Sequence, residues 1–212
     1  MYCSQCVGIE EIFTRKIAKR ELKRYRKKGP YKTTRYLIDA LEKENIQGMT
    51  LLDIGGGVGA IQHELLKGGI AHTVDVDASS SYLEAAKEEG RRQGSFERMK
   101  FYFGDFVNLA PNMEAADIVT LDRVICCYDD VEKLLRFSAA RARKFYGVIY
   151  PRFTTWVKMG ITFGNFLLWL GRSQFRIFLH STEMVDRVIQ SNGLQRFFYD
   201  QTFLWQVVIY RR

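Results

Sequence analysis

The stretch Leu51-Leu52-Asp53-Ile54-Gly55-Gly56-Gly57-Val58-Gly59 decides the fold. It completes an apolar run that starts at Met49, and it ends in glycines just ahead of a helical pattern of apolar residues. Glycines let a backbone come close to a ligand, and the first turn of a helix offers N–H groups without partners. The stretch therefore predicts a strand, a tight loop and a helix whose N-terminus faces a ligand.

Further strands and helices alternate along the chain. We expect the next strands at Ala71–Val76, Met99–Phe103, Asp117–Leu121 and Phe145–Tyr150. A capping box at Ser81–Glu84 should open one helix, and Ser181 should cap another that runs through Ile189 with Gly193 at its C′ position. Such alternation implies right-handed crossovers and a parallel sheet covered by helices.

The end of the chain departs from this alternation. Leu194–Gln201 and Phe203–Tyr210 are strand-like runs with almost nothing between them, which permits only an antiparallel hairpin. The predicted fold class is therefore α/β, with a Rossmann-like, seven-stranded, mostly parallel sheet that finishes in an antiparallel hairpin.

Acidic residues follow the second and third predicted strands. Asp77 stands about 20 residues beyond the glycines, where a carboxylate can accept hydrogen bonds from both ribose hydroxyls. Asp105 can meet an adenine ring and Phe106 can pack on it. Asp75 is a rival to Asp77, but Asp77 comes directly before the next helix cap. These residues predict a nucleoside site, and a tight turn without ligand is the alternative.

The spacing Asp-x-Gly-x-Gly-x-Gly, the acidic partners and the terminal hairpin resemble the class I S-adenosylmethionine-dependent methyltransferases over residues 35–212. The resemblance implies an enzyme with S-adenosylmethionine as cofactor. It assigns the residues as follows: Asp53, Gly55, Gly57 and Gly59 to the methionine part, Asp77 to the ribose, Asp105 and Phe106 to the adenine, and Leu121 with Asp122 to the methyl side.

Candidate acceptor-side residues follow the fourth strand or precede the last helix: Asp122, Arg123, Cys126, Cys127, Tyr128 and His180. Among these we predict Asp122, Tyr128 and His180 as catalytic. The two cysteines are more simply small buried side chains, and His180 is equally well read as a hydrogen-bonded part of the core cover. An acceptor that is already anionic needs no base, whereas a hydroxyl or ammonium must lose a proton.

Three short stretches look similar to the magnesium-protoporphyrin methyltransferase subgroup, namely Arg24–Pro30, Leu121-Asp122 with Tyr128, and His180. That resemblance implies O-methylation of a porphyrin propionate. Where the subgroup has a histidine before the tyrosine, this chain has Cys127. We therefore predict O-methylation of a small apolar or carboxylate-bearing acceptor, with a porphyrin-like molecule as one example.

Residues 153–177 form an apolar insertion after the fifth strand, rich in Trp, Phe, Met and Leu. It fits either a helix packed on the sheet, an apolar acceptor pocket, or a segment that rests on a membrane surface with Lys158, Arg172 and Arg176 toward the headgroups. Its longest apolar run, about ten residues, is too short to span a bilayer. Peripheral membrane contact is therefore one expectation.

The excess of basic side chains behind the net charge of +8 lies in residues 15–35. This segment holds eleven basic side chains and one acidic one. The sequence predicts a basic helical extension at 1–32, interrupted at Gly29-Pro30, and a methyltransferase domain at 33–212. The extension would serve as a lid, with Tyr25 or Lys28 near the methionine carboxylate. An RNA methyltransferase that uses it to neutralise phosphates is the alternative function, and a non-catalytic nucleoside-binding protein is a further one.

The cysteines form two close pairs, Cys3/Cys6 and Cys126/Cys127, which does not suit a secreted disulfide framework. Together with an N-terminus that has no signal pattern, this predicts a cytoplasmic protein. Cys3 and Cys6 have the spacing of half a zinc site, but no second pair matches them, so we predict no metal.

Overall fold

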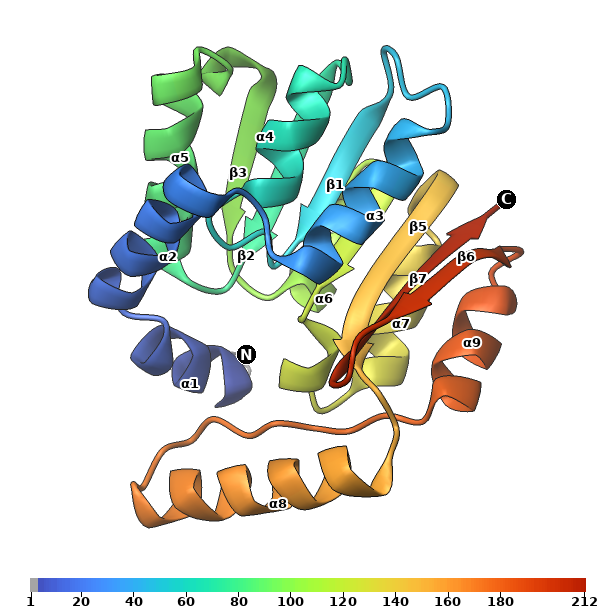
Figure 1. The fold of residues 1–212 in the computed structure, drawn as a ribbon. Helices are drawn as coiled ribbons and strands as arrows, with labels where there is room; N and C mark the ends of the chain where they lie inside the picture. The colour runs from blue at the N-terminus through green and yellow to red at the C-terminus, as the bar shows by residue number, and fades with distance from the viewer. Residues whose placement is uncertain (1–3) are drawn as a thin grey trace.

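The computed structural model describes residues 4–212, and side chains from residue 8 onward. Seven strands form one sheet: β1 (Thr50–Ile54), β2 (His72–Asp77), β3 (Met99–Phe103), β4 (Ala116–Asp122), β5 (Ala142–Pro151), β6 (Gln195–Gln201) and β7 (Trp205–Arg211). Their order is β3-β2-β1-β4-β5-β7-β6. Strands β1 to β5 run parallel, whereas β7 pairs antiparallel with both β5 and β6 (Figure 1). The predicted fold class, including the terminal hairpin, is confirmed.

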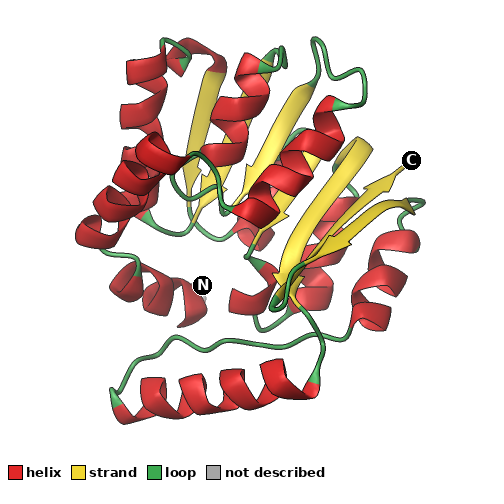
Figure 2. Ribbon diagram, in the orientation of Figure 1, coloured by secondary structure: helices red, strands yellow, loops and turns green. Residues whose placement is uncertain are grey.

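Helices cover both faces of this sheet (Figure 2). They are α1 (Ser4–Ile12), α2 (Arg15–Lys28), α3 (Lys32–Glu42), α4 (Ala60–Lys67), α5 (Ser80–Gln93), α6 (Phe106–Leu109), α7 (Val131–Ala139), α8 (Thr155–Leu170) and α9 (Thr182–Gln190).

Side chains alternate across the sheet and so build two cores. In β1, Leu51 packs with the core beneath α3 and α4, while Leu52 and Ile54 pack with the core beneath α7 and α9. This is the period of two that a strand imposes on its side chains. Both faces of the sheet are therefore buried. A ligand can reach the sheet only at the edge where the parallel strands end.

Two predicted helix boundaries are wrong by a few residues. The cap of α5 is Ser79, whose hydroxyl accepts from the amide of Tyr82, so the predicted Ser81–Glu84 box already lies inside the helix. Ser181 does cap α9, as predicted, by accepting from Met184. That helix ends at Gln190 with Ser191 as C-cap, so its C′ residue is Asn192 and Gly193, the predicted C′ residue, lies one position further on.

The basic segment is packed on the domain. Ala18, Leu22 and Tyr25 of α2 are buried in a small cluster with Val58 and Ala85. The Tyr25 hydroxyl also donates to Glu64 at 2.8 Å. Gly29-Pro30 separates α2 from α3 as predicted. The boundary at residue 32 stays a prediction.

Helix α8 stands apart from the sheet. Val157 is its buried residue, and its inner face packs against residues 173–180, which return to α9 (Figure 1). The Asn165 amide fixes this packing, because it donates to the carbonyl of Ile177 and accepts from the Ile177 amide, at 2.7 and 2.9 Å. Within residues 4–212, no helix is long and apolar enough to cross a membrane.

Candidate functional site

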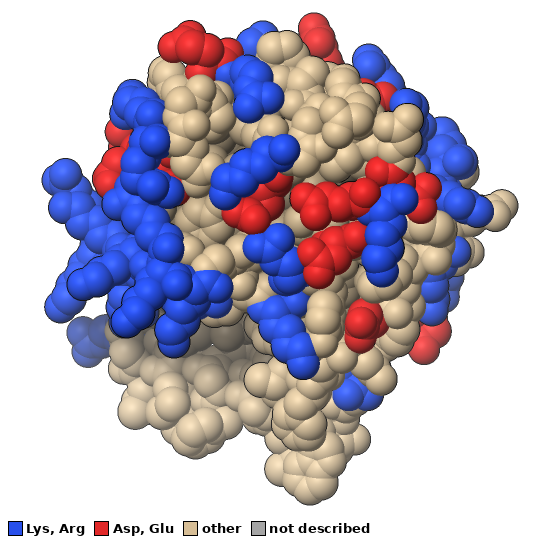
Figure 3. Space-filling view, turned by 45° about the horizontal axis from the view of Figure 1, so that its top comes forward, with Lys and Arg blue, Asp and Glu red and all other residues tan. Residues whose placement is uncertain are grey.

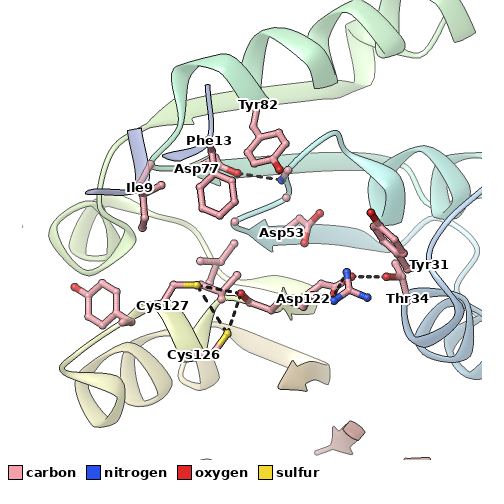
Figure 4. Close-up of a pocket in the computed structure, with 18 of the residues that line it drawn as sticks. Ile9, Phe13, Tyr31, Thr34, Asp53, Asp77, Tyr82, Asp122, Cys126 and Cys127 are labelled. Carbon is pink, nitrogen blue, oxygen red and sulfur yellow. Dashed lines mark hydrogen bonds and ion pairs between the residues drawn. The ribbon is translucent and has the colours of Figure 1, made fainter. Parts of the chain in front are cut away.

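A cavity of about 840 Å³ lies at the carboxyl ends of the parallel strands. In Figure 4, Phe13, Tyr82 and Asp77 stand on one side of it, Tyr31, Thr34 and Asp122 stand on the other, and Asp53 lies between them. Of the predicted site residues, those that line the cavity are Asp53, Gly55, Gly57, Asp77, Asp105, Phe106, Asp122 and Tyr128. Gly59, Leu121 and His180 are not among the lining residues.

The glycine loop is shaped by close contacts beneath it and is open above. A Cβ on Gly56 would lie 2.4 Å from Nε2 of Gln62 and 2.9 Å from Oδ2 of Asp53, so this position accepts no side chain. Gly57 has φ of 59° and nothing within 4 Å of where its Cβ would be. The loop therefore leaves room for a ligand to lie against its backbone.

Three buried carboxyl groups gather under this loop. Asp53 accepts from the Thr120 hydroxyl at 2.7 Å and from Gln62 at 3.2 Å. Asp75 is completely buried, and neither of its oxygens has a hydrogen-bond partner among the described residues. Burial raises the pKa of Asp53, Asp75 and Asp77, and the charges of its two neighbours raise that of Asp75 further. Among the three, burial and two acidic neighbours therefore favour the neutral form of Asp75.

Of the two rival carboxylates predicted for the ribose, Asp75 does not line the cavity and Asp77 does. Its two oxygens accept from the amide of Gly57 at 3.0 Å and from the amide of Ser79 at 2.7 Å. The carboxylate thus joins the loop after β1 to the start of α5. A carboxylate has about four acceptor positions, so two remain for ligand hydroxyls.

Asp105 and Tyr128 are joined across the cavity floor. The Tyr128 hydroxyl lies 2.9 and 3.0 Å from the two Asp105 oxygens, and Asp105 also caps α6 by accepting from Val107. Phe106 is buried beside them. The predicted adenine residues and one predicted catalytic residue therefore form a single connected unit.

Asp122 ends β4 on the opposite side of the cavity. It accepts a 2.5 Å hydrogen bond from the Thr34 hydroxyl and lies 3.5 Å from the Arg123 guanidinium. Burial raises the pKa of Asp122, although Arg123 and Thr34 oppose that rise.

Arg123 has an unusual backbone with φ of 61°, a conformation that costs a non-glycine residue about 1 kcal/mol or more. Its guanidinium lies 4.7 Å from the ring centre of Tyr31 and 5.1 Å from that of Trp205, and it donates to the Thr33 hydroxyl at 2.7 Å. All of these except Thr33 line the cavity. These contacts hold Arg123 in its strained conformation, with its positive charge at the border of the cavity.

The predicted histidine and cysteine residues differ from these carboxylates in where they lie. One ring nitrogen of His180 is 2.9 Å from the carbonyl of Ile125, which places His180 behind the turn that leads to Tyr128. Cys126 is buried, and the thiols of Cys126 and Cys127 both contact the Arg123 carbonyl. Cys3 and the side chain of Cys6 lie outside the described residues. Among the side chains described, no group of three or more His, Cys, Asp or Glu residues is arranged to hold a metal ion.

Sequence reasoning missed the N-terminal cover of the cavity. Phe13 packs between Tyr82 and Phe175, with ring centres 5.3 and 6.1 Å away, and its carbonyl accepts from the Ser79 hydroxyl. Tyr25 lines the cavity, whereas Lys28 does not, and the lid role of this segment stays a prediction. In the sequence, the sign of this cover is an apolar residue, Phe13, just before the basic segment. The neighbouring sequence does not show which part of the protein Phe13 covers.

Comparisons with known proteins agree with this arrangement. A family model described as a methyltransferase domain matches residues 45–158, just over half of the chain. The ribosomal protein L11 methyltransferase of Photorhabdus laumondii is 28% identical over 74 residues, which is 35% of this chain and 25% of that protein. The corresponding protein of Enterobacter sp. strain 638 is 28% identical over 91 residues, 43% and 30% of the two chains. The chain thus spans between a quarter and a third of these relatives.

Two solved structures are similar in fold over nearly the whole chain. Magnesium protoporphyrin IX methyltransferase (ChlM) from Synechocystis PCC 6803, with bound SAH, has a TM-score of 0.72 at 16% identity and covers 96% of this chain and 98% of that one. A chain of the Haloferax volcanii complex between the Trm112 methyltransferase activator and a putative methyltransferase has a TM-score of 0.70 at 15% identity, covering 96% of both. Since the family model covers more than half of the chain and the sheet has the same overall arrangement, the chain belongs to the methyltransferase domain family, among the class I S-adenosylmethionine-dependent methyltransferases.

Proposed function

We propose that this enzyme O-methylates a carboxylate on an apolar small molecule. The observation that carries the proposal is Arg123, a cation held in a strained backbone conformation at the edge of an apolar cavity. Strained residues persist where the surrounding structure imposes them, and they cluster at functional sites. A guanidinium is also the side chain best suited to grip a carboxylate.

The donor half of the cavity suits S-adenosylmethionine. Asp77 would accept from the ribose, the loop of Gly55 and Gly57 would lie along the methionine part, and Asp105 with Phe106 would hold the adenine. The open space above Gly57 and the two free acceptor positions of Asp77 support this assignment. When bound, the donor supplies a methyl group already activated by a positively charged sulfur.

The acceptor half is bounded by Arg123, Trp156 and Trp205, with Val157, Ile161 and Ile177 as further apolar lining. Thr33 occupies one of the five N–H donors of Arg123, and Asp122 lies 3.5 Å away as its ion-pair partner, so the other donors remain for an acceptor carboxylate. Apolar walls exclude water and hold the acceptor for in-line displacement. An anionic acceptor loses no proton, so the site needs no base.

The predicted catalytic residues then take different roles. Asp122 orients Arg123, and Tyr128 borders both halves of the cavity through Asp105. His180 is a positioning residue, because it contacts the turn before Tyr128 and not the cavity. A His180→Gln variant should weaken acceptor binding without removing activity, whereas loss of kcat alone would contradict this role.

RNA methylation remains the second candidate, favoured by the basic surface over α2 (Figure 3). Against it, the cavity behind that surface has an apolar acceptor half.

A cytoplasmic location is proposed as well, in keeping with the free thiols of Cys126 and Cys127.

Transfer of tritiated methyl from labelled S-adenosylmethionine into an organic extract of cells tests the proposal. Arg123→Gln should lower incorporation about tenfold, because a lost charged hydrogen bond is worth about 1.5–3 kcal/mol, while calorimetric affinity for the donor stays unchanged. Arg143→Gln, at an exposed site at the start of β5, is the matched control. Equal incorporation by wild type and Arg123→Gln would refute the anchoring role of Arg123.

A further inference from the structure

The outward face of α8 has no partner within the described chain. Large apolar side chains there are half or more exposed: Trp156, Met159, Phe163, Phe166, Leu167, Trp169 and Leu170. On a helical wheel, Met159, Phe163, Phe166 and Leu170 form one stripe, opposite the inner face that carries Val157 and Asn165. Apolar patches of this size on a monomer mark a surface that meets something else.

The charged side chains on and around α8 are all basic. Between Arg152 and Thr182 the chain has four basic side chains, Arg152, Lys158, Arg172 and Arg176, and no acidic one. Lys158 and Arg172 are exposed at opposite ends of the helix. An apolar stripe with tryptophans near both ends and cations beside it is typical of a helix that lies in a membrane interface.

The basic surface of α2 extends this pattern. Exposed cations on α2 include Arg15, Lys16, Lys19, Arg20 and Lys23. In Figure 1, α2 lies on the same side of the molecule as the C-terminal end of α8. In Figure 3, basic side chains gather over α2, next to an uncharged region below them. The two surfaces therefore complement an anionic, apolar partner together.

We propose that α8 docks in the surface of an anionic lipid bilayer, with the cations of α2 and of the α8 segment against the headgroups. A helix of 16 residues is about 24 Å long, and it would lie along the membrane plane. Each cation close to an anionic surface adds to binding, and salt weakens this contribution.

Docking would bring the cavity to the membrane. Trp156, Gly160 and Ile161 of α8 line the cavity, and Trp156 is also 74% exposed. One helix thus borders both the proposed lipid surface and the acceptor half. This consequence rests on the proposed function, but the docking itself does not.

Sedimentation of the full chain with vesicles tests the docking. Vesicles of phosphatidylglycerol and phosphatidylcholine should bind the protein about fivefold more tightly than phosphatidylcholine alone, and the fluorescence of Trp156 and Trp169 should shift to the blue. Phe163→Glu/Phe166→Glu should lower binding about tenfold. These two residues do not line the cavity, so affinity for S-adenosylmethionine should stay unchanged.

The matched control is Tyr102→Glu, which adds a charge at an exposed aromatic residue on the edge strand β3. It should bind vesicles as the wild type does. Equal binding by wild type and the double variant, or no binding to either vesicle, overturns the proposal. Self-association that the double variant abolishes, without vesicle binding, would identify a second copy as the occupant and overturn it too. Failure of donor binding in the wild type would refute the proposed function and leave the docking result standing.

Discussion

The hydroxyl of Thr34 donates a 2.5 Å hydrogen bond to Oδ2 of Asp122, joining residues that are 88 positions apart in the chain. It connects α3, which follows the basic segment, to the end of β4, where the proposed acceptor half begins. Asp122 in turn lies 3.5 Å from Arg123. The N-terminal segment thereby takes part in forming the proposed acceptor site.

Replacing Thr34 by valine should destabilise the protein by about 1–3 kcal/mol near neutral pH, because a buried carboxylate loses its donor. Burial already raises the pKa of Asp122, and protonation removes the cost of the charge. The deficit should therefore shrink as pH falls below neutral. Urea denaturation measures it, and Thr34→Ser, which keeps the hydroxyl, is the control. A pH-independent deficit would argue against this bond.

Asp77→Asn should weaken S-adenosylmethionine binding about tenfold or more, because the amide replaces one acceptor by a donor. The new NH₂ group would face the amide of Gly57 or that of Ser79, both of which donate, and the ribose would lose an acceptor. Isothermal calorimetry gives the affinity. Asp129→Asn, at a site outside the cavity lining, should bind like wild type. Wild-type affinity in Asp77→Asn would remove Asp77 from the donor site.

Gly56→Ala should both destabilise the protein and abolish donor binding. Its Cβ would lie 2.4 Å from Gln62 and 2.7 Å from Asp75, so the loop or the carboxyl cluster must move, at a cost of about 1–3 kcal/mol. Gly164→Ala in α8 meets nothing within 4 Å and should be neutral or slightly stabilising. Thermal unfolding with and without donor compares the two. A Gly56→Ala protein that binds donor normally would show that the loop backbone is not the contact surface.

Glu64 links the basic segment to α4. Burial alone would raise its pKa, but hydrogen bonds from Lys67, Tyr25 and Arg35 outweigh burial and lower the pKa to about 2. The ordinary value is about 4.3, so this stabilisation is fully present above that pH and is lost as pH falls toward 2. Glu64→Gln should cost about 1 kcal/mol at pH 7, since the group is partly exposed, and the difference from wild type should shrink below about pH 4.

Chemical denaturation at several pH values measures this effect. Glu97→Gln, at an exposed site, should behave as wild type at every pH. A constant Glu64→Gln deficit down to low pH would mean that packing, and not the ion pairs, holds α2 in place.

The sequence alone could bring together the residues of the proposed donor half, but not those of the proposed acceptor half, for a physical reason. The glycine loop and Asp77 belong to two consecutive strands, so their spacing along the chain fixes their meeting at the sheet edge. Tyr31, Arg123 and Trp205 meet only through the folded sheet, and no local pattern relates them. The start of α5 was misplaced because Ser79, Ser80 and Ser81 are consecutive candidates, and packing selected Ser79.

The conformation of Arg123 was also beyond prediction. A positive φ is expected of glycine or asparagine, so an arginine there leaves no sequence signal. By contrast, the apolar character of α8 was evident from the sequence. Its exposure was not, because a helical pattern of apolar residues usually indicates packing on a core.

The nature of the methylated bond tests the account most directly. Methyl esters of carboxylates are hydrolysed by mild alkali, whereas methyl groups on nitrogen, and those on ether oxygens, are stable there. After transfer from tritiated S-adenosylmethionine into a cell extract, we expect the label in the organic phase, and we expect alkali to release it as volatile methanol. Label that stays in RNA or protein, or that withstands alkali, would contradict carboxylate methylation of an apolar acceptor.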